Sequence, residues 1–473
     1  MDTCTTVART ASQRESIAHL LNRAAYGPTA ELAEHVQCVG PTDWIEEQLH
    51  PDSIDDADLA ARLAAYPSVA MSTAELLVRY PARKIGMMPD PTTAPGRILD
   101  DQNAALVTRA VHGRAQLEAV LTDFWLNHFN VLAPKGPTKW TIASYVRDTI
   151  RPHVLGRFED LLRATAKSPA MLYYLDNYLN ATDGDGGGIN ENYGRELMEL
   201  HTLGVDGGYT QDDVREVSRA FTGWSITPDE SGAIDFVYHP TWHDTDPKTV
   251  LGVPIPRGQI AEGYRVLHLL AHHPSTANFI ATELVRRLVS DDPPAALVSA
   301  ARTAFIRTAG DLREVVRVIL TADIFSDPRY YGAKAKSPLH FVASALRAVG
   351  ADVKQGFAAA GLVAAIGQPL LQAVPPTGWS DRVEDVVSVG GMLSRFSAAQ
   401  QLASNAVEGV DIDTHQWDYL KRGWRAVNRL LVAILQRPGT AATRHALERL
   451  VNEGAEPATV VALALSSPEF QQC

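Results

Sequence analysis

Ile189-Asn-Glu-Asn-Tyr-Gly-Arg-Glu-Leu-Met-Glu-Leu-His-Thr-Leu-Gly204 is the stretch whose residue spacing decides the fold class. At about 100° per residue, its apolar side chains gather on one broad face. These side chains are Ile189, Tyr193, Leu197, Leu200 and Leu203. The same helical period recurs along most of the chain. We therefore predict a mainly α protein built as a large multi-helix globular domain.

One region departs from the helical period. Ala233–Tyr238 and Thr249–Val253 have the pattern of two short strands around the polar link His239–Lys248, which predicts a small β-hairpin insertion near residues 233–253. No repeat of fixed period is present, so a solenoid is not supported. We expect one domain over residues 1–473, with N-terminal helices (12–175), a central loop-rich site region (176–253) and C-terminal helices (258–466).

Composition excludes several classes of protein. The chain has 473 residues, of which 45% are hydrophobic and 21% charged, so wholesale disorder is excluded. Its net charge of −12 disfavours binding to nucleic acid or to an anionic membrane. Three cysteines cannot form a disulfide framework. Because the first fifteen residues are polar and no apolar run reaches the ~20 residues of a membrane span, we expect a soluble, cytoplasmic protein.

Glu196 lies within the apolar face of the helix quoted above, and Asn192 and Glu199 lie beside it. A carboxylate directed into an apolar interior must be paired, protonated or metal-bound, because an isolated buried charge is too costly. The alternatives are therefore a structural ion pair and a catalytic or metal site. Arginines available for such a pair include Arg195, Arg147 and Arg23.

His128 is a second polar group on an apolar helical face. That face is formed by Leu117, Val120, Leu121, Phe124 and Val131. A lone histidine in this position is more often a hydrogen-bonded core residue than a ligand. Two helices each direct one ionisable group inward, however, so His128 could be the partner of Glu196 or Glu199, directly or through a metal ion.

Several familiar motifs are absent. The glycine-rich turn before Asn190 lacks the Lys of a phosphate-binding loop. Pro240 argues against a helix that would place His239 and His243 on one face, and no HExxH zinc helix occurs. His272 and His273 are interpreted as a polar helix end before Pro274. GxSxG, GxGxxG and SxxK motifs are also missing.

The chain resembles a large bacterial family known as domain of unknown function number 1800. The matching stretches are His19–Pro28, Trp125–Val131, Tyr145–His153, Asn190–Thr210, Phe221–Trp224, His243-Asp244 with Lys248 and Leu251-Gly252, Lys336–Pro338, and Gly367-Gln368 with Pro376–Trp379. The resemblance implies no activity and no catalytic residues. Members of the family are often exported and encoded beside another uncharacterised family, which implies a co-encoded protein partner. Because the first fifteen residues are polar, we expect this chain to depart from that pattern.

Three functions compete on the sequence alone. The first is a hydrolase of a sugar-like, polyol or glycan substrate, with Glu196 as acid, Glu199 or Asp176 as base or nucleophile, and His128 beside them. Aromatic platforms and amides suit sugar faces and hydroxyls. The expected substrate-binding residues are Trp125, Asn127, Asn177, Asn192, Trp224 and Trp242.

The second function is that of an enzyme dependent on a divalent metal. Mixed histidine and carboxylate ligation suits zinc, manganese or iron. The candidate ligands are His128, Glu196, Glu199, His243 and Asp244. The third function is that of a non-catalytic scaffold that binds the co-encoded protein. A cavity lined by Trp and Asn would favour the hydrolase, and a missing pocket around Glu196 would favour the scaffold.

Overall fold

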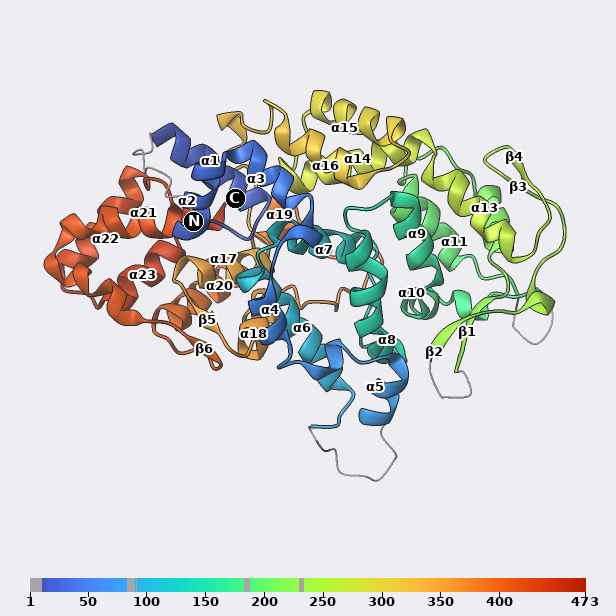
Figure 1. The fold of residues 1–473 in the computed structure, drawn as a ribbon, viewed down its shortest axis with the longest axis horizontal. Coiled ribbons are helices and arrows are strands. Elements are labelled where there is room, and N and C mark those ends of the chain that lie inside the picture. The colour runs from blue at the N-terminus through green and yellow to red at the C-terminus, as the bar shows by residue number, and fades with distance from the viewer. Residues whose placement is uncertain (1–10, 83–89, 91, 183–187, 229–233) are drawn as a thin grey trace.

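The computed structural model describes residues 11–82, 90, 92–182, 188–228 and 234–473, and its elements are overwhelmingly helical (Figure 1). The first twelve α-helices are α1 Ala11–Arg23, α2 Ala30–Val39, α3 Pro41–Gln48, α4 Ala57–Leu63, α5 Thr73–Arg79, α6 Gly96–His112, α7 Gln116–His128, α8 Thr138–Ser144, α9 Phe158–Lys167, α10 Pro169–Tyr174, α11 Asn192–Glu196 and α12 Gln211–Ala220. The mainly α class is confirmed.

The remaining helices follow the strands of the central region. They are α13 Ile260–Ala271, α14 Pro274–Leu288, α15 Ala295–Arg307, α16 Leu312–Thr321, α17 Pro338–Ala348, α18 Phe357–Ile366, α19 Val383–Val386, α20 Val389–Ala403, α21 Val427–Leu435, α22 Ala441–Asn452, α23 Pro457–Leu465 and α24 Pro468–Gln471. Among the helices of the described residues, none has both the length and the apolar character that a membrane span requires.

The strands form separate two-stranded antiparallel sheets. The pairs are β1 Trp224–Pro228 with β2 Ile234–Tyr238, β3 Lys248–Val250 with β4 Val253–Ile255, and β5 Asp352–Val353 with β6 Val410–Asp411. The predicted hairpin region is therefore present, but the pairing expected within it is wrong. Leu251 and Gly252 both have positive φ (51° and 74°), so the chain turns back inside the second expected strand. A two-residue turn with positive φ at both positions is the usual closure of a tight hairpin.

Two large apolar clusters form the core. The first gathers α1–α3, most of α7 and the helices between α8 and α16, and the second gathers α17, α18 and the helices after them. α6 and α7 contribute to both clusters, since Ile98 and Leu121 belong to the first whereas Val107 and Val120 belong to the second. The helices α21–α23 form one end of the molecule, and the hairpins β1–β2 and β3–β4 lie at the other (Figure 1). The single-domain division stays a prediction.

Two helical segments are wound as π-helix, namely Tyr145–Ile150 and Leu197–Thr202. The second continues α11 directly, so the helix predicted from Ile189 to Gly204 changes its winding after Glu196. π-Helical turns are rare and often occur at functional sites. Leu200, in the second of these segments, lines the cavity described below.

Candidate functional site

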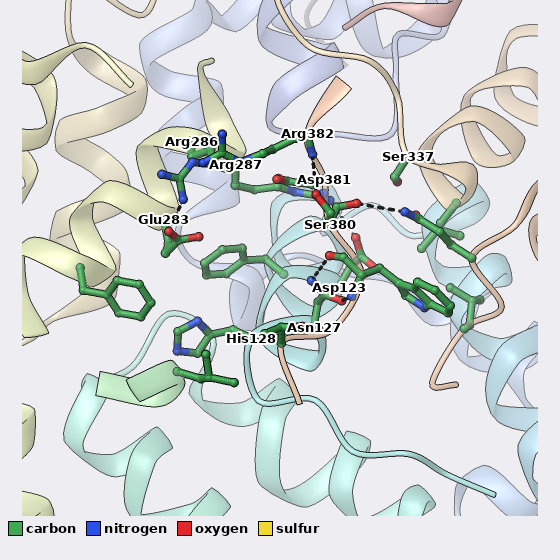
Figure 2. A pocket seen from close by; sticks show the side chains of 18 residues that line it. Asp123, Asn127, His128, Glu283, Arg286, Arg287, Ser337, Ser380, Asp381 and Arg382 are labelled. Atoms are coloured by element: carbon green, nitrogen blue, oxygen red, sulfur yellow. Dashed lines mark hydrogen bonds and ion pairs between the residues drawn. The ribbon is translucent and has the colours of Figure 1, made fainter. Parts of the chain in front are cut away.

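A cavity of about 250 Å³ lies where α7, α14 and the loop after α18 meet (Figure 2). Three segments far apart in the sequence supply most of its wall. α7 supplies Asp123, Phe124, Asn127 and His128; α14 supplies Phe279, Glu283, Arg286 and Arg287; and residues 368–382 supply Gln368, Leu370, Thr377, Trp379, Ser380, Asp381 and Arg382. Leu200, in the second π-helical turn, completes this wall together with Ser337 and Leu339. The cavity is therefore polar and charged, with aromatic faces.

Asn127 fixes the loop of residues 367–382 to the end of α7. Its side-chain nitrogen donates to the main-chain oxygen of Trp379 at 2.8 Å, and its side-chain oxygen accepts from the main-chain nitrogen of Trp379 at 2.7 Å. Gly378 has φ of 70°, and a Cβ there would lie 2.5 Å from the main-chain oxygen of Asn127. Only glycine allows this close approach.

Asn130 and Tyr174 hold the same loop at further points. The buried Asn130 amide donates to the main-chain oxygens of Ala373 and Pro375 at 3.0 and 2.9 Å. The Tyr174 hydroxyl donates to the main-chain oxygen of Val374 at 2.8 Å. The loop therefore replaces regular secondary structure with side-chain hydrogen bonds, which satisfy its main-chain groups.

Asp123 is paired with Arg287 across the cavity wall. The two side chains are 2.8 Å apart and are 25% and 12% exposed. Burial raises the pKa of Asp123 above its ordinary value, although the Arg287 guanidinium opposes that effect. This carboxyl group therefore keeps a proton to a higher pH than an exposed aspartate does.

Asp381 has the opposite electrostatic setting. Burial alone would raise its pKa, but Lys334 and Arg287 hold it below the ordinary value. The Lys334 ammonium lies 3.4 Å from the Asp381 carboxylate and also pairs with Asp291. The pKa values of Asp381 and Asp123 are therefore shifted in opposite directions within the same cavity.

His128 lines the cavity as a neutral imidazole. Its Nε2 lies 3.2 Å from the main-chain oxygen of His201, and burial lowers its pKa to about 4. His201 is buried in the second π-helical turn, and burial together with His128 lowers its pKa to about 3. The structure does not pair His128 with Glu196 or Glu199 as predicted. The polar neighbour of its Nε2 is instead the main-chain oxygen of His201.

Glu196 and Glu199 are half-buried and lie outside the cavity wall, although Leu200 belongs to it. The ion pairs between described residues include none that involves Glu196, and Arg195 pairs with Glu191 instead at 3.2 Å. Burial and the nearby Glu199 raise the pKa of Glu196. Glu199 accepts a hydrogen bond from the hydroxyl of Tyr209 at 3.1 Å. Glu196 is therefore not half of the structural ion pair considered from the sequence.

Asp176, Asn177 and Asn192 support the main chain. Asp176 has a left-handed φ of 58° and pairs with Lys135 at 2.9 Å. The buried Asn177 donates to the main-chain oxygen of Trp224 at 3.0 Å, and the exposed Asn192 donates to that of Leu175 at 3.1 Å. Their polar atoms are thus occupied by contacts within the fold.

The three tryptophans predicted to bind substrate do not line the cavity either. Trp125 and Trp224 are fully buried in the core. Trp242 is half-buried, with its ring centroid 4.3 Å from that of His239. Of the ten catalytic and substrate-binding candidates from the sequence, the cavity brings together Asn127 and His128. The tryptophan that does face it is Trp379.

His243 and Asp244 belong to a separate buried charge network. His243 Nε2 and the Lys248 ammonium lie 3.2 and 2.7 Å from the same Glu262 oxygen. Arg219 pairs with Asp244 at 2.7 Å. This network links the segment before β3 to α12 and α13, far along the chain from His128. The five metal ligands expected from the sequence are therefore divided among separate places.

The sequence analysis missed the charged residues of the cavity. Arg287 lies three residues after Leu284 and seven after Ile280, both buried on α14. This spacing places Arg287 on an apolar helical face, so its inward position could have been predicted from the sequence. Asp381 has no periodic signal, because its loop is irregular. The signal nearest to it is the stretch Pro376–Trp379, which ends two residues before it.

Comparison with known proteins gives one family match. A family model described as protein of unknown function (DUF1800) matches residues 19–472. No curated protein and no solved structure matches the chain. Asn127 and Trp379, which close the cavity, both lie within the matched range.

Proposed function

The chain belongs to the DUF1800 family, and from that premise we propose that it is a hydrolase of a sugar-like or polyol substrate bound in the cavity of α7, α14 and residues 368–382. The observation that supports this proposal best is the pair Asp123 and Asp381. The pKa of Asp123 is raised by burial, whereas Lys334 and Arg287 hold that of Asp381 low. Two carboxyl groups whose pKa values are moved apart can divide the work of acid and base.

The proposed chemistry follows from this difference in pKa between the two carboxyl groups. Asp123 donates its proton to the oxygen of the leaving group as the glycosidic C–O bond breaks. Asp381 accepts a proton from the water molecule that forms the new C–O bond at the anomeric carbon. The two protons balance, because the product sugar gains a hydroxyl and the leaving group gains a hydrogen.

The other lining residues suit such a substrate. Trp379 and Phe124 offer apolar faces, and Gln368, Ser337 and Ser380 offer donors and acceptors for hydroxyl groups. Trp379 and Asn127 line the cavity, which favours an enzyme, whereas the position of Glu196 outside its wall meets the condition set from the sequence for a scaffold. The co-encoded partner protein stays a prediction.

The test is a screen of hydrolytic activity with para-nitrophenyl hexosides, pentosides and hexosaminides. We expect release of nitrophenol from at least one of them by the wild-type protein, and loss of at least ~100-fold in kcat for Asp381→Asn. The matched control is Asp323→Asn, because Asp323 is an exposed aspartate distant from the cavity wall. No release from the whole panel, or release that Asp381→Asn leaves unchanged, would contradict the proposal.

A further inference from the structure

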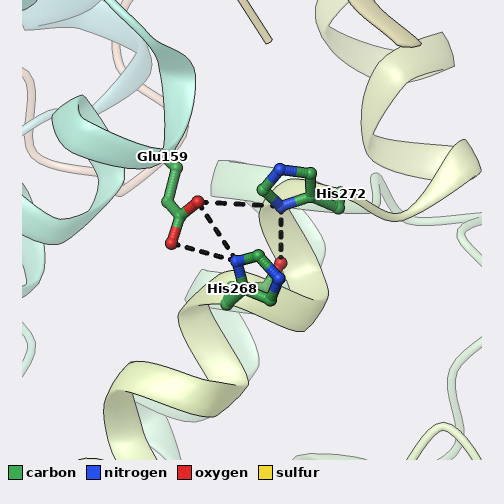
Figure 3. A group of neighbouring side chains, drawn as sticks. All are labelled: Glu159, His268 and His272. Atoms are coloured by element: carbon green, nitrogen blue, oxygen red, sulfur yellow. Dashed lines mark hydrogen bonds and ion pairs between the residues drawn. The ribbon is translucent and has the colours of Figure 1, made fainter. Parts of the chain in front are cut away.

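Glu159, His268 and His272 form a compact group on the surface between α9 and α13 (Figure 3). Among the described residues, they are the one group of three or more His, Cys, Asp or Glu side chains whose ligand atoms all lie within 4.8 Å of one another. None of them lines the cavity proposed as the hydrolase site. The group therefore stands apart from the function proposed above.

The helical positions explain why the three side chains meet. His268 lies in the last turn of α13 and His272 caps that helix four residues later, so both rings lie on one face. α9 packs its apolar side against the core, with Phe158, Leu161 and Leu162 buried, and this leaves Glu159 facing α13. The two ring centroids are 4.3 Å apart.

The distances match those that a tetrahedral cation requires. Glu159 Oε2 lies 3.2 Å from Nδ1 of His268 and 3.7 Å from Nδ1 of His272. Bonds of about 2.0–2.1 Å from zinc to nitrogen or oxygen place two ligand atoms about 3.3–3.4 Å apart. The two distances from the carboxylate to the imidazoles thus differ from this value by only tenths of an ångström, and all three ligand atoms lie within 4.8 Å of one another.

The surroundings orient the carboxylate for this role. Arg163 donates to Glu159 Oε1 at 2.6 and 2.9 Å, whereas His268 Nδ1 lies 3.2 Å from each of the two carboxylate oxygens. Hydrogen bonds of this kind to a ligand orient it for metal binding. His268 and His272 are 61% and 36% exposed, so a cation can enter from solvent and keep water at the open position. His272 would exchange its present contact with the main-chain oxygen of His268, at 3.0 Å, for the metal.

We propose that Glu159, His268 and His272 bind a divalent first-row transition cation, of which Zn²⁺ is the type, and so join α9 to α13. Two imidazoles and one carboxylate are ligands that zinc, copper and nickel prefer, whereas Mg²⁺ and Ca²⁺ prefer oxygen ligands alone. Three protein ligands leave one position of the tetrahedron for water.

The experiment is a Zn²⁺ titration of untagged full-length protein that has first been treated with a chelator and dialysed. Isothermal titration calorimetry gives the affinity, and elemental mass spectrometry after dialysis gives the stoichiometry. We expect His268→Ala and His272→Ala each to lose one equivalent of Zn²⁺, or to bind it at least about tenfold more weakly. Mg²⁺ at the same concentration should give no heat from this site.

The control variant is His445→Ala, which removes an exposed histidine on α22 and should leave the stoichiometry unchanged. A second readout is the melting temperature, which Zn²⁺ should raise in the wild-type protein and not in His268→Ala, because a ligand stabilises the state that binds it. Equal stoichiometry, affinity and melting response in wild type and both histidine variants would overturn the proposal.

Discussion

Asn127 and Trp379, 252 positions apart in the sequence, are joined by two hydrogen bonds of 2.8 and 2.7 Å. The Asn127 side chain thus donates to and accepts from the main chain of Trp379, in the way that a neighbouring β-strand would. It places Asp381, two residues later, on the same cavity wall as Asp123. The Asn127 carboxamide, together with Asn130 and Tyr174, therefore positions the loop that carries the proposed base.

Asn127→Ala removes both hydrogen bonds to Trp379. Because the main-chain groups of Trp379 would be left unpaired, we expect the free energy of unfolding to fall by about 1–3 kcal/mol. Chemical denaturation monitored by circular dichroism measures this change, with Asn452→Ala, at an exposed position on α22, as the control. Unfolding midpoints that agree between the two variants would refute the role of Asn127 as an anchor.

Arg287→Met leaves Asp123 without its cation in a largely buried place. We expect a loss of about 1–3 kcal/mol, because the Asp123 carboxyl group loses its charge-assisted hydrogen bond from Arg287 and its raised pKa rises further. The control is Arg329→Met, since Arg329 is 76% exposed and pairs with Asp327 at the surface. A surface pair of that kind contributes about 0–1 kcal/mol. Equal, small losses in the free energy of unfolding of both variants would show that the Asp123–Arg287 pair stabilises the fold no more than a surface pair does.

Stability should fall below pH 6.5 because of His128. The pKa of His128 is about 4 in the folded protein, below the value near 6.5 of an unfolded chain, so the unfolded state binds the extra proton in this window. The contribution of His128 is fully present above pH 6.5 and is lost as the pH falls toward 4.

His128→Phe tests this pH dependence, because Phe124, Phe129 and Phe279 already surround the ring. Between pH 7 and pH 5, we expect the variant to lose about 2 kcal/mol less stability than the wild-type protein. Urea denaturation at the two pH values gives the comparison, and His445→Ala should keep the wild-type dependence. A variant that loses as much stability as the wild type would show that His128 is not held neutral.

Glu196→Gln should cost little stability. Burial and Glu199 raise the pKa of Glu196, and its carboxylate has no ion pair with a described residue, so the neutral amide removes a repulsion. We expect a change within about 1 kcal/mol. Glu118→Gln is the contrast, because it breaks a half-buried pair with Arg151 at 3.2 Å and should cost more. A large loss of stability for Glu196→Gln would instead indicate that Glu196 belongs to a structural ion pair, as considered from the sequence.

Regular helices could be predicted from the sequence, whereas irregular connections between them could not. Apolar periodicity and flanking Gly or Pro predict helices over Phe357–Ile366 and Pro457–Leu465, and α18 and α23 have these bounds. The same periodicity predicts a helix over Trp417–Gln436, but α21 begins only at Val427, since Gly423 has φ of 108° and ends a 3-10 segment. The hairpin pairing failed because a turn at Leu251 requires positive φ in a residue that rarely adopts it.

Only some residues of the candidate site could be predicted from the sequence, for the same reason. His128 and Asn127 could be found because they lie on a periodic helix, whereas Asp381 lies on a loop positioned by the side chains of Asn127, Asn130 and Tyr174. His272 was interpreted as a helix end, which overlooked its spacing of four residues from His268. Glu159 could not have been added from the sequence, because only the packing of α9 on α13 brings it there.

The proposed hydrolysis depends most on Asp123 as the acid that protonates the leaving group. The direct measurement is kcat of Asp123→Asn and of wild type on aryl glycosides whose leaving groups range from dinitrophenol to unsubstituted phenol. A good leaving group needs no proton, so the variant should approach the wild-type rate with dinitrophenol and fall at least ~100-fold behind with phenol. A loss of the same factor for every leaving group would contradict the assignment of Asp123 as the acid.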